Sequence, residues 1–377
     1  MKLNERIRKT LSQIKALDQE AMEKVRQRQD MLTKPLGSLG RLEALSVQLA
    51  GITGGSFPPG AKKKVVLFAA DHGVVSEGVS AYPQEVTVQM VANIVNGGAA
   101  INVLSRQAGA EVRVIDIGVG VPLDIDGVTA AKVRPGTGNF SREEAMTRRE
   151  AEEALLVGIS AAEEEVASGT GLLATGEMGI GNTTASSAVM AALTGYDPAL
   201  VVGRGTGLDD AQLENKVRIV ERALALHKPD PADPVSVLSK VGGLEIAGLA
   251  GLILGAASLR CPVVIDGFIS TVASLLAVKM NPLAAGYLIP SHLSQESGHA
   301  LLLNYMDLKP YFNLEMRLGE GTGAVLAMHL VEAAARILQE MSTFDEAGVS
   351  NKDSVEKEAG CKKGAGVKKG VPNIKEQ

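Results

Sequence analysis

The chain has 377 residues, a formal net charge of −5 and 45% hydrophobic residues, so it is long enough for a large core or two domains. Aromatic residues make up only 3% and no basic patch is interleaved with them, which argues against a nucleic-acid-binding protein. Two isolated cysteines, Cys261 and Cys361, argue against a disulfide framework or a zinc site. The N-terminus is charged and helix-forming, unlike a signal peptide, and no apolar run reaches the roughly 20 residues of a membrane span. These features predict a cytoplasmic protein without a membrane partner.

The first predicted elements are helices. Apolar residues recur at three- and four-residue steps from Leu3 to Val25, which predicts one amphipathic helix that Pro35 ends. Ser38 is a suitable N-cap for a second helix whose leucines include Leu42. No strand is predicted between these two helices.

From Lys63 onward, short apolar runs alternate with helices. The predicted strands are Val65–Ala69, Val112–Ile117, Leu172–Thr175, Val263–Ile265 and Tyr287–Ile289. Continuous β-branched runs are typical of a sheet buried on both faces, and the alternation with helices implies parallel pairing by right-handed crossovers. One helix is expected to begin at Ser141, because Glu144 three residues later completes a capping box. The sequence therefore predicts a doubly wound, mainly parallel α/β fold.

The end of the chain changes character again. A last helix is predicted from near Thr322 to about Met341. Residues 345–377 carry few large apolar side chains and contain the sequence Lys-Lys-Gly twice, which predicts a disordered tail. A basic docking segment is the alternative interpretation of this tail.

Polar segments follow the predicted strands. They are Asp71–Gln84, Gly176–Thr184, Asp266–Gly267 and Pro290–Ser294. In open α/β sheets, ligands bind beyond the carboxyl ends of the strands, so we expect these segments to form one shared pocket.

Three glycine-rich segments each precede a helix, namely Gly179–Thr184, Val202–Gly207 and Gly319–Gly323. Exposed backbone N–H groups at a helix N-terminus favour an anion. None of the three matches the Walker motif or the dinucleotide fingerprint, so each alone is more typical of a packing turn. Three in one chain favour phosphate or phosphoribosyl binding.

Glu320 is the most unusual acidic residue, because it is flanked by glycines and lies next to a helix start. It could serve as a charge that stabilises the helix dipole or as a general base, and the spacing leaves both roles open. The same two roles are open for Glu177.

The five histidines do not predict a metal site. His292 and His299 are seven residues apart and lack the HExxH context. His227 and His329 fall within helical patterns and are interpreted as structural, and His72 as a hydrogen-bonding scaffold residue at a strand end. The absence of a Gly-x-Ser-x-Gly elbow argues against a serine hydrolase.

Five segments carry a resemblance to one known family. They are Thr33–Gly40, Asp71–Gln84, Gly176–Thr184, Gly203–Gly207 and Leu318–Gly323. Together, in this order, they resemble the nicotinate-nucleotide:dimethylbenzimidazole phosphoribosyltransferases. The resemblance implies a large Rossmann-like domain over residues 59–290 and a small helical domain formed by residues 1–58 and 291–344. It also implies a homodimer, with the tail of residues 345–377 lying outside the match.

The resemblance further implies a reaction. Phosphoribose would pass from nicotinate mononucleotide to 5,6-dimethylbenzimidazole, with inversion and without a cofactor, giving nicotinate and the α-ribazole 5′-phosphate of the cobalamin lower ligand. Glu320 would be the catalytic base. The residues implied to contact the base ring are Ser80, Tyr82 and Gln89. Those implied to hold the nucleotide or the rest of the substrates are Glu177, Gly179, Gly181, Asn182, Thr183, Gly203, Gly205, Lys216, Asp266, Ser294 and Gly319.

Two alternatives remain open at this point. A nucleoside phosphorylase or another base-exchange transferase would share the phosphate sites and the inversion. A non-catalytic nucleotide-binding regulator would use Glu320 only as a helix-end charge.

Overall fold

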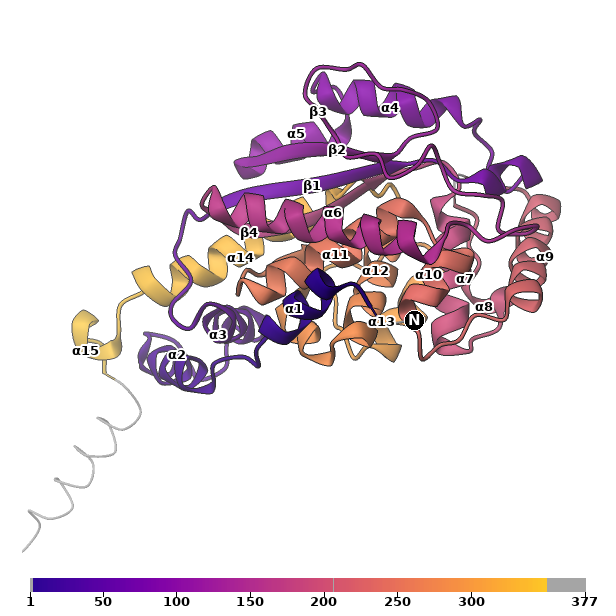
Figure 1. Ribbon diagram of the computed structural model, residues 1–377. Coiled ribbons are helices and arrows are strands. Elements are labelled where there is room, and N and C mark those ends of the chain that lie inside the picture. The colour runs from indigo at the N-terminus through magenta and orange to yellow at the C-terminus, as the bar shows by residue number, and fades with distance from the viewer. Residues whose placement is uncertain (1–2, 206, 351–377) are drawn as a thin grey trace, which may run out of the picture.

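The computed structural model describes residues 3–205 and 207–350 of the chain. At its centre lies one parallel sheet with the strand order β3-β2-β1-β4-β5-β6 (Figure 1). The strands are β1 Lys62–Ala70, β2 Ala110–Gly118, β3 Val128–Ala130, β4 Thr170–Met178, β5 Val263–Ile265 and β6 Leu288–Pro290. The predicted doubly wound α/β fold is confirmed. Because the chain winds outward in both directions from β1, the topological switch point lies between β1 and β4.

Both faces of the sheet are buried. In β1, Val66 and Phe68 belong to the core on one face, whereas Val65 and Leu67 belong to the core on the other. This alternation between two buried faces explains why the strand reads as a continuous apolar run.

Helices cover the two faces as separate layers. The first face carries α1 Glu5–Gln13, α6 Arg148–Ala167, α7 Asn182–Thr194, α10 Pro234–Val241, α11 Leu244–Ser258 and α12 Phe268–Met280. The second face carries α3 Arg41–Thr53, α4 Glu85–Val95, α5 Ala100–Ala108 and α14 Thr322–Glu340. The remaining elements are α2 Gln19–Met31, α8 Pro198–Val201, α9 Asp210–His227, α13 Ser297–Tyr305, α15 Phe344–Ala347 and the 3₁₀ helices η1 Gly73–Glu77 and η2 Pro282–Tyr287.

Glycines let α6 and α11 pack closely. A Cβ atom at Gly158 of α6 would lie 1.9 Å from the carbonyl oxygen of Gly248, and one at Gly251 would lie 2.0 Å from that of Leu155. The high glycine and low aromatic content of the chain thus corresponds to a core in which helix backbones touch.

The segment Glu85–Ala108 is the one stretch of the described residues that is long and apolar enough to cross a membrane. It is two helices rather than one, because α4 ends at Val95 and Gly97, with a φ of 80°, turns the chain into α5. The buried side chains of Val91 and Ile101 pack on the sheet, so the apolar character of this segment is explained by the core.

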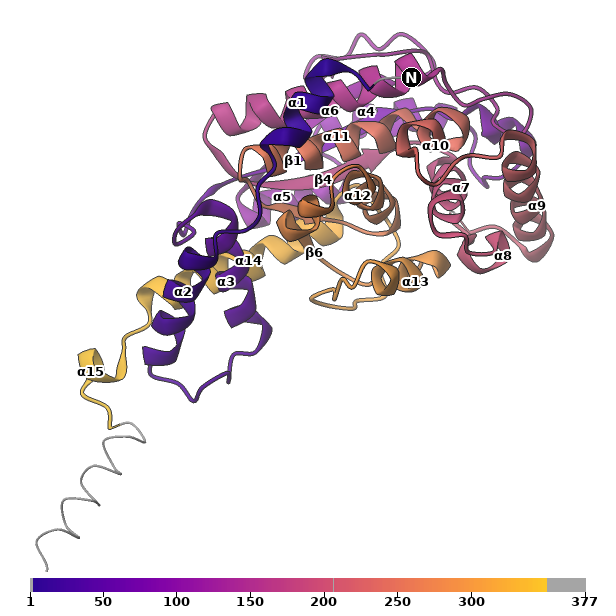
Figure 2. The ribbon, with the colours of Figure 1, turned by 60° about the horizontal axis from the view of Figure 1, so that its bottom comes forward.

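Helices α2 and α3 from the N-terminal part of the chain meet the C-terminal part beside the sheet. Figures 1 and 2 show α2, α3 and α15 gathered around the far end of α14. Leu32 forms an antiparallel bridge with Thr343, and Leu338 of α14 packs against Val25 and Val47. By contrast, α1 packs against α6 and α11, and α13 packs against α7, α8 and α12. The domain boundaries implied by the resemblance stay a prediction.

Two predicted helix limits near the N-terminus are wrong. The helix expected from Leu3 to Val25 is interrupted between α1 and α2, because the side chain of Asp18 accepts the backbone N–H of Ala21 and starts a new helix. The N-cap of α3 is Gly40, with a φ of 54°, and not Ser38.

The helix start predicted at Ser141 is also wrong. Its hydroxyl donates to Asn139 Oδ1 at 2.7 Å in a loop, and α6 begins only at Arg148. The capping box is formed instead by Thr147 and Glu150.

Near the C-terminus, the predicted last helix agrees with α14. The predicted tail begins too early, because Thr343 and Glu346 form a capping box at the start of α15. Residues 351–377 of that tail lie outside the described residues.

Candidate active site

A cavity of about 560 Å³ opens at the carboxyl ends of β1, β4 and β5. Its lining comes from the segments that follow β1, β4, β5 and β6, together with the loop that leads into α14. The structure therefore brings the polar strand-end segments together around one cavity, at the switch point of the sheet.

Most residues proposed from the sequence line this cavity. They are Ser80, Tyr82, Glu177, Gly179, Gly181, Asn182, Thr183, Gly205, Asp266, Ser294, Gly319 and Glu320. Three do not: Gln89 is exposed on α4, and Gly203 and Lys216 lie buried behind the lining.

The backbone around Glu320 is left-handed at three consecutive residues. Glu320 has a φ of 62° and stands between Gly319 at 82° and Gly321 at 94°. The left-handed conformation costs a non-glycine residue about 1–2 kcal/mol of free energy. Interactions with the surrounding structure must therefore hold the backbone of Glu320 in this conformation. The carboxylate of Glu177 does so by accepting the backbone N–H of Glu320 at 3.2 Å, and that of Asp266 by accepting the N–H of Gly321 at 3.1 Å.

The side chain of Glu320 is 5% exposed, and its Oε2 atom has no hydrogen-bond partner among the described residues. Burial raises the pKa of Glu320, and the charge of Asp266 adds to this, while the backbone N–H of Ile101 opposes it. A desolvated carboxyl group of a cavity-lining residue, with one oxygen that is not engaged in a hydrogen bond, is suited to accept a proton from a bound ligand.

The N-terminus of α14 is occupied by the protein's own carboxylate. Asp266 Oδ1 accepts the N–H of Ala324 and Oδ2 that of Gly321, both at 3.1 Å. The interpretation of Gly319–Gly323 as a phosphate site is therefore wrong, because Asp266 already fills that anion position. The same contact argues against Glu320 as the charge that stabilises α14.

The N-terminus of α7, by contrast, faces the cavity without a capping side chain. Gly181 has a φ of 93°, and a Cβ atom at Gly179 would lie 2.3 Å from the carbonyl oxygen of Ala70. Glycine at these positions lets the loop close onto β1 and leaves Asn182 and Thr183 in the cavity wall. This helix end can bind an anion.

Lys216 lies behind this wall, fully buried. Its Nζ donates to Thr183 Oγ1 at 2.9 Å and to the carbonyl oxygen of Gly203 at 3.0 Å. Burial lowers the pKa of Lys216 to about 8, although the charge of Glu296 opposes the shift. Lys216 thus ties the Gly203 segment to the start of α7, and it supports the site through Thr183.

Glu177 links two segments of the cavity lining through hydrogen bonds. Its carboxylate accepts hydrogen bonds from the side chain of Asn182 and from the backbone of Glu320. Burial, with the charge of Asp266, raises the pKa of Glu177 to about 8. A Cβ atom at Gly319 would lie 2.4 Å from Glu177 Oε1, so this contact requires glycine there.

The part of the cavity near β1 suits a flat apolar ring. Val86, Met90 and Leu318 line it, together with Ser80 and the half-exposed Tyr82. These side chains offer apolar surface with a few hydroxyl groups, which is typical of sites for small aromatic ligands.

Four polar residues of the lining were not proposed as site residues from the sequence: Ser270, His292, Glu296 and Arg317. Of these, His292 lies within the segment Pro290–Ser294, which the sequence did predict at the pocket. Arg317 directly precedes the Leu318–Gly323 motif, so its position was the available signal. His292 stacks on Phe312, and its Nε2 lies 3.6 Å from Asp266 Oδ1, a neighbourhood that only the fold reveals.

His72 lies beneath the start of α7. Its Nε2 and Glu245 Oε1 are 2.8 Å apart, and both side chains are fully buried. Burial disfavours the charged ring, but Glu245 outweighs that effect and raises the pKa of His72. A Cβ atom at Gly181 would lie 3.4 Å from that of His72, so the ion pair supports the loop from below.

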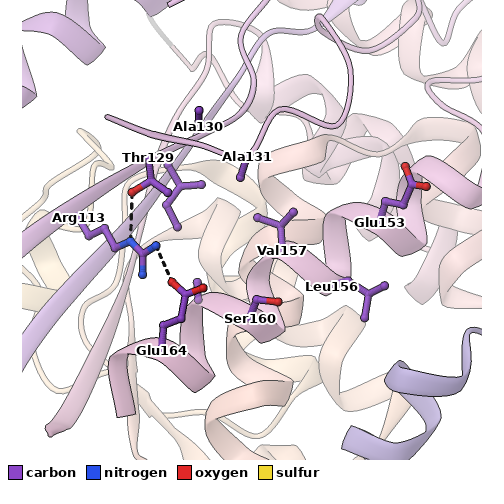
Figure 3. Close-up of a pocket in the computed structure, with 11 residues that line it drawn as sticks. Arg113, Thr129, Ala130, Ala131, Glu153, Leu156, Val157, Ser160 and Glu164 are labelled. Carbon is purple, nitrogen blue, oxygen red and sulfur yellow. Dashed lines mark hydrogen bonds and ion pairs between the residues drawn. The ribbon is translucent and has the colours of Figure 1, made fainter. Parts of the chain in front are cut away.

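A second cavity, of about 320 Å³, lies between α6 and the β2–β3 edge of the sheet (Figure 3). Its arginine, Arg113, bonds Thr129 Oγ1 at 3.3 Å and Glu164 Oε2 at 2.8 Å, and it also pairs with Glu165. Because its cation is already neutralised, this cavity offers no comparable reactive group.

Comparison with known proteins places the chain among phosphoribosyltransferases. A family model described as phosphoribosyltransferase matches residues 14–349. The nicotinate-nucleotide–dimethylbenzimidazole phosphoribosyltransferases of Chloroflexus aggregans and Geobacter sulfurreducens are 58% and 54% identical to this chain, each over 91% of it and 98% of their own length. The crystal structure of the Thermus thermophilus protein of that name has a TM-score of 0.84 at 49% identity and covers 89% of this chain and 100% of its own. A structure described as CobT from the same organism has a TM-score of 0.85 at 50% identity, with coverages of 88% and 99%.

Proposed function

We propose that this chain, which belongs to the nicotinate-nucleotide–dimethylbenzimidazole phosphoribosyltransferase family, transfers phosphoribose from nicotinate mononucleotide to 5,6-dimethylbenzimidazole. The observation that carries the proposal is Glu320, a buried residue of the cavity lining whose Oε2 atom has no hydrogen-bond partner among the described residues. The names of the relatives, matched over nine tenths of the chain, support the choice of substrates.

The chemistry needs one base and no general acid. A ring nitrogen of dimethylbenzimidazole attacks the anomeric carbon, and the bond from that carbon to the pyridinium nitrogen breaks. Nicotinate leaves with the electron pair and gains no proton. The attack leaves a proton on the second benzimidazole nitrogen, and Glu320 accepts it. Attack on the face opposite to the leaving group inverts the anomeric carbon and gives α-ribazole 5′-phosphate, the lower-ligand precursor of cobalamin.

Other parts of the cavity have matching roles in this proposal. The start of α7, with Asn182 and Thr183, binds the phosphoribosyl part of the nucleotide. Val86, Met90 and Leu318 contact the benzimidazole ring. Glu177 and Asp266 hold the backbone of Glu320 in place.

The proposal includes a cytoplasmic homodimer, as the family resemblance implies. Large apolar side chains that are exposed in the single chain support the dimer, for example Leu36 at 73% and Leu314 at 61% exposure. Light scattering on the purified protein at several concentrations measures the oligomeric state directly, and a monomer throughout would contradict the dimer.

The test of function is turnover by the purified full-length chain. Nicotinate mononucleotide is incubated with a panel of benzimidazoles and purines, and the nucleotide products are identified by mass spectrometry. We expect release of nicotinate and a nucleotide of the added base. Turnover that requires free phosphate would indicate a phosphorylase, and nucleotide binding without turnover would indicate a regulator.

A further inference from the structure

The cavity contains far more acidic than basic groups. Its lining includes the carboxyl groups of Glu177, Asp266, Glu296 and Glu320. Among the described residues that line it, Arg317 is the single lysine or arginine. A nucleotide phosphate carries negative charge, so a cation in direct contact with the phosphate would favour its binding in this cavity.

Arg317 lies next to the start of α7. Its Nη1 donates to the carbonyl oxygen of Gly205 at 3.1 Å. A Cβ atom at Gly205 would lie 2.9 Å from Thr183 Oγ1, so the guanidinium reaches the neighbourhood of that hydroxyl. Arg317 is exposed and forms no ion pair within the part of the chain that the structure describes. Four of its five N–H donors are therefore available to a ligand at the cavity rim.

The other nearby cation is less suited to direct contact. Lys216 is fully buried behind the lining, and two of its three N–H donors are used by Thr183 and Gly203. Burial also lowers the pKa of Lys216 to about 8, so its charge is held less firmly than that of a guanidinium.

Arg317 and Glu320 stand on one short loop. The residues between Arg317 and α14 are fixed by the left-handed backbone at Gly319–Gly321 and by the carboxylates of Glu177 and Asp266. A phosphate held by Arg317 would therefore be placed at a set distance from the carboxyl group of Glu320, and the anomeric carbon would be oriented with it.

We infer that Arg317 binds the 5′-phosphate of the nucleotide substrate and thereby positions the ribose relative to Glu320. This inference rests on the proposed function, because it takes nicotinate mononucleotide as the ligand.

The experiment compares substrates with and without the phosphate. Wild type, Arg317→Ala and Arg317→Lys are assayed with nicotinate mononucleotide and with nicotinate riboside, which lacks the phosphate. Arg336→Ala is the matched control, because Arg336 is an arginine of α14 outside the cavity lining that pairs with Glu332 and Glu340. Melting temperatures confirm that each variant is folded.

We expect Arg317→Ala to lower kcat/KM for nicotinate mononucleotide by roughly 10- to 100-fold, the usual range for one charge-assisted hydrogen-bonded contact. Most of the loss should appear as a higher KM, and Arg317→Lys should recover part of it. With the riboside, wild type and Arg317→Ala should agree within about threefold, because the contact is missing in both. Arg336→Ala should match wild type with both substrates.

Three results would overturn the assignment. An equal loss with mononucleotide and riboside means that Arg317 does not contact the phosphate. A loss with nicotinate mononucleotide but none with nicotinamide mononucleotide would assign Arg317 to the carboxylate of the nicotinate ring. Unchanged kcat/KM for Arg317→Ala with the mononucleotide would remove Arg317 from the site altogether.

Failure of the proposed function looks different. In that case wild type itself shows no transfer to any base. The role of Arg317 is then tested by calorimetry, which measures the binding of nicotinate mononucleotide and of the riboside to wild type and to Arg317→Ala. Weaker binding of the mononucleotide alone to Arg317→Ala would support the contact with the phosphate.

Discussion

Three buried carboxyl groups surround the left-handed turn before α14, and their partners give them different roles. Glu177 and Asp266 each accept backbone N–H groups of the turn or of α14, so their oxygens are committed to structure. Glu320 also lines the cavity, but its Oε2 atom has no hydrogen-bond partner among the described residues. The carboxyl groups of Glu177 and Asp266 therefore stabilise the backbone, whereas that of Glu320 is suited to accept a proton.

If Glu320 is the base, Glu320→Gln should lower kcat by about 10²- to 10⁴-fold, the usual contribution of a general base. Glutamine keeps the shape of the side chain, so we expect the affinity for nicotinate mononucleotide to change by no more than a few-fold. Rapid-quench kinetics and calorimetric binding give the two quantities. Glu332→Gln, in α14 but outside the cavity lining, is the control. Near-normal kcat with a lowered melting temperature would show a structural role only.

The buried Glu177 predicts a pH-dependent effect on stability. Its pKa is raised to about 8 in the folded chain, so the stability that protonated Glu177 contributes is fully present below its usual pKa and is lost as pH rises through about 8. Glutamine cannot ionise. The melting temperature of Glu177→Gln minus that of wild type should therefore increase from pH 6 to pH 9.

Glu332→Gln provides the contrast for this measurement. Burial works against the charged form of Glu332, but the N–H of Gly60 and the charge of Lys63 outweigh it and lower the pKa, so Glu332 is ionised throughout that interval. Its difference from wild type should stay constant, and a constant difference for Glu177→Gln as well would refute the raised pKa.

The role of a residue could be predicted from the sequence only where the neighbouring residues in the sequence indicate that role. Glu320 stands out because a carboxylate between glycines beside a helix start is unusual. The positions of Asp266 and Lys216 depend on segments more than 30 residues away, at Gly321 and Thr183, and no local pattern shows those contacts.

At the scale of elements, two helices begin after similar glycine-rich segments, but only one of the two N-termini is available to a ligand. The start of α14 is filled by Asp266, whereas the start of α7 is open to the cavity. The difference arises because Asp266, directly after β5, accepts the backbone N–H groups of Gly321 and Ala324 at the start of α14. A glycine-rich segment before a helix thus predicts an anion site only when no internal carboxylate reaches it.

Gly179→Ala tests the loop before α7. Its Cβ atom would lie 2.3 Å from the backbone oxygen of Ala70, so the loop must move or β1 must shift. We expect a destabilisation of about 1–3 kcal/mol and a higher KM for nicotinate mononucleotide. Gly55→Ala, where a Cβ atom meets nothing within 4 Å, should leave both unchanged. Chemical denaturation and steady-state kinetics measure the two effects, and equal behaviour of the two variants would refute the role of Gly179.

The core strands could be predicted because two buried faces demand continuous apolar residues. The edge strand β3, Val128–Ala130, was not predicted because it is only partly buried, whereas the equally short strands β5 and β6 are buried throughout. The break between α1 and α2 was missed because apolar periodicity continues across it, while the cap at Asp18 is a local polar contact.

At the scale of the whole molecule, the C-terminal limit of the folded chain can be tested by truncation. The bridge between Leu32 and Thr343 and the contact of Arg28 with Glu346 show that residues up to α15 take part in the fold. We expect truncation after Ser350 to leave kcat/KM and melting temperature unchanged, since the sequence beyond it lacks apolar periodicity.

Truncation after Leu338 is the matched comparison and should destabilise the chain, because it removes the bridge to Leu32 and leaves α14 incomplete. Loss of activity on removing residues 351–377 would contradict the interpretation of this segment as dispensable.

The packing of α2 and α3 against α14 has a consequence for how the protein folds during synthesis. Helices α2 and α3 leave the ribosome long before the helix they pack against, because α14 begins roughly 270 residues after the end of α3. At about 5–20 residues per second, the apolar sides of α2 and α3 wait on the order of tens of seconds for their partner. Glu320 is synthesised directly before α14. A nascent chain that stalls before α14 therefore lacks the helix that covers the apolar sides of α2 and α3, and transiently exposed apolar surface of this kind favours aggregation.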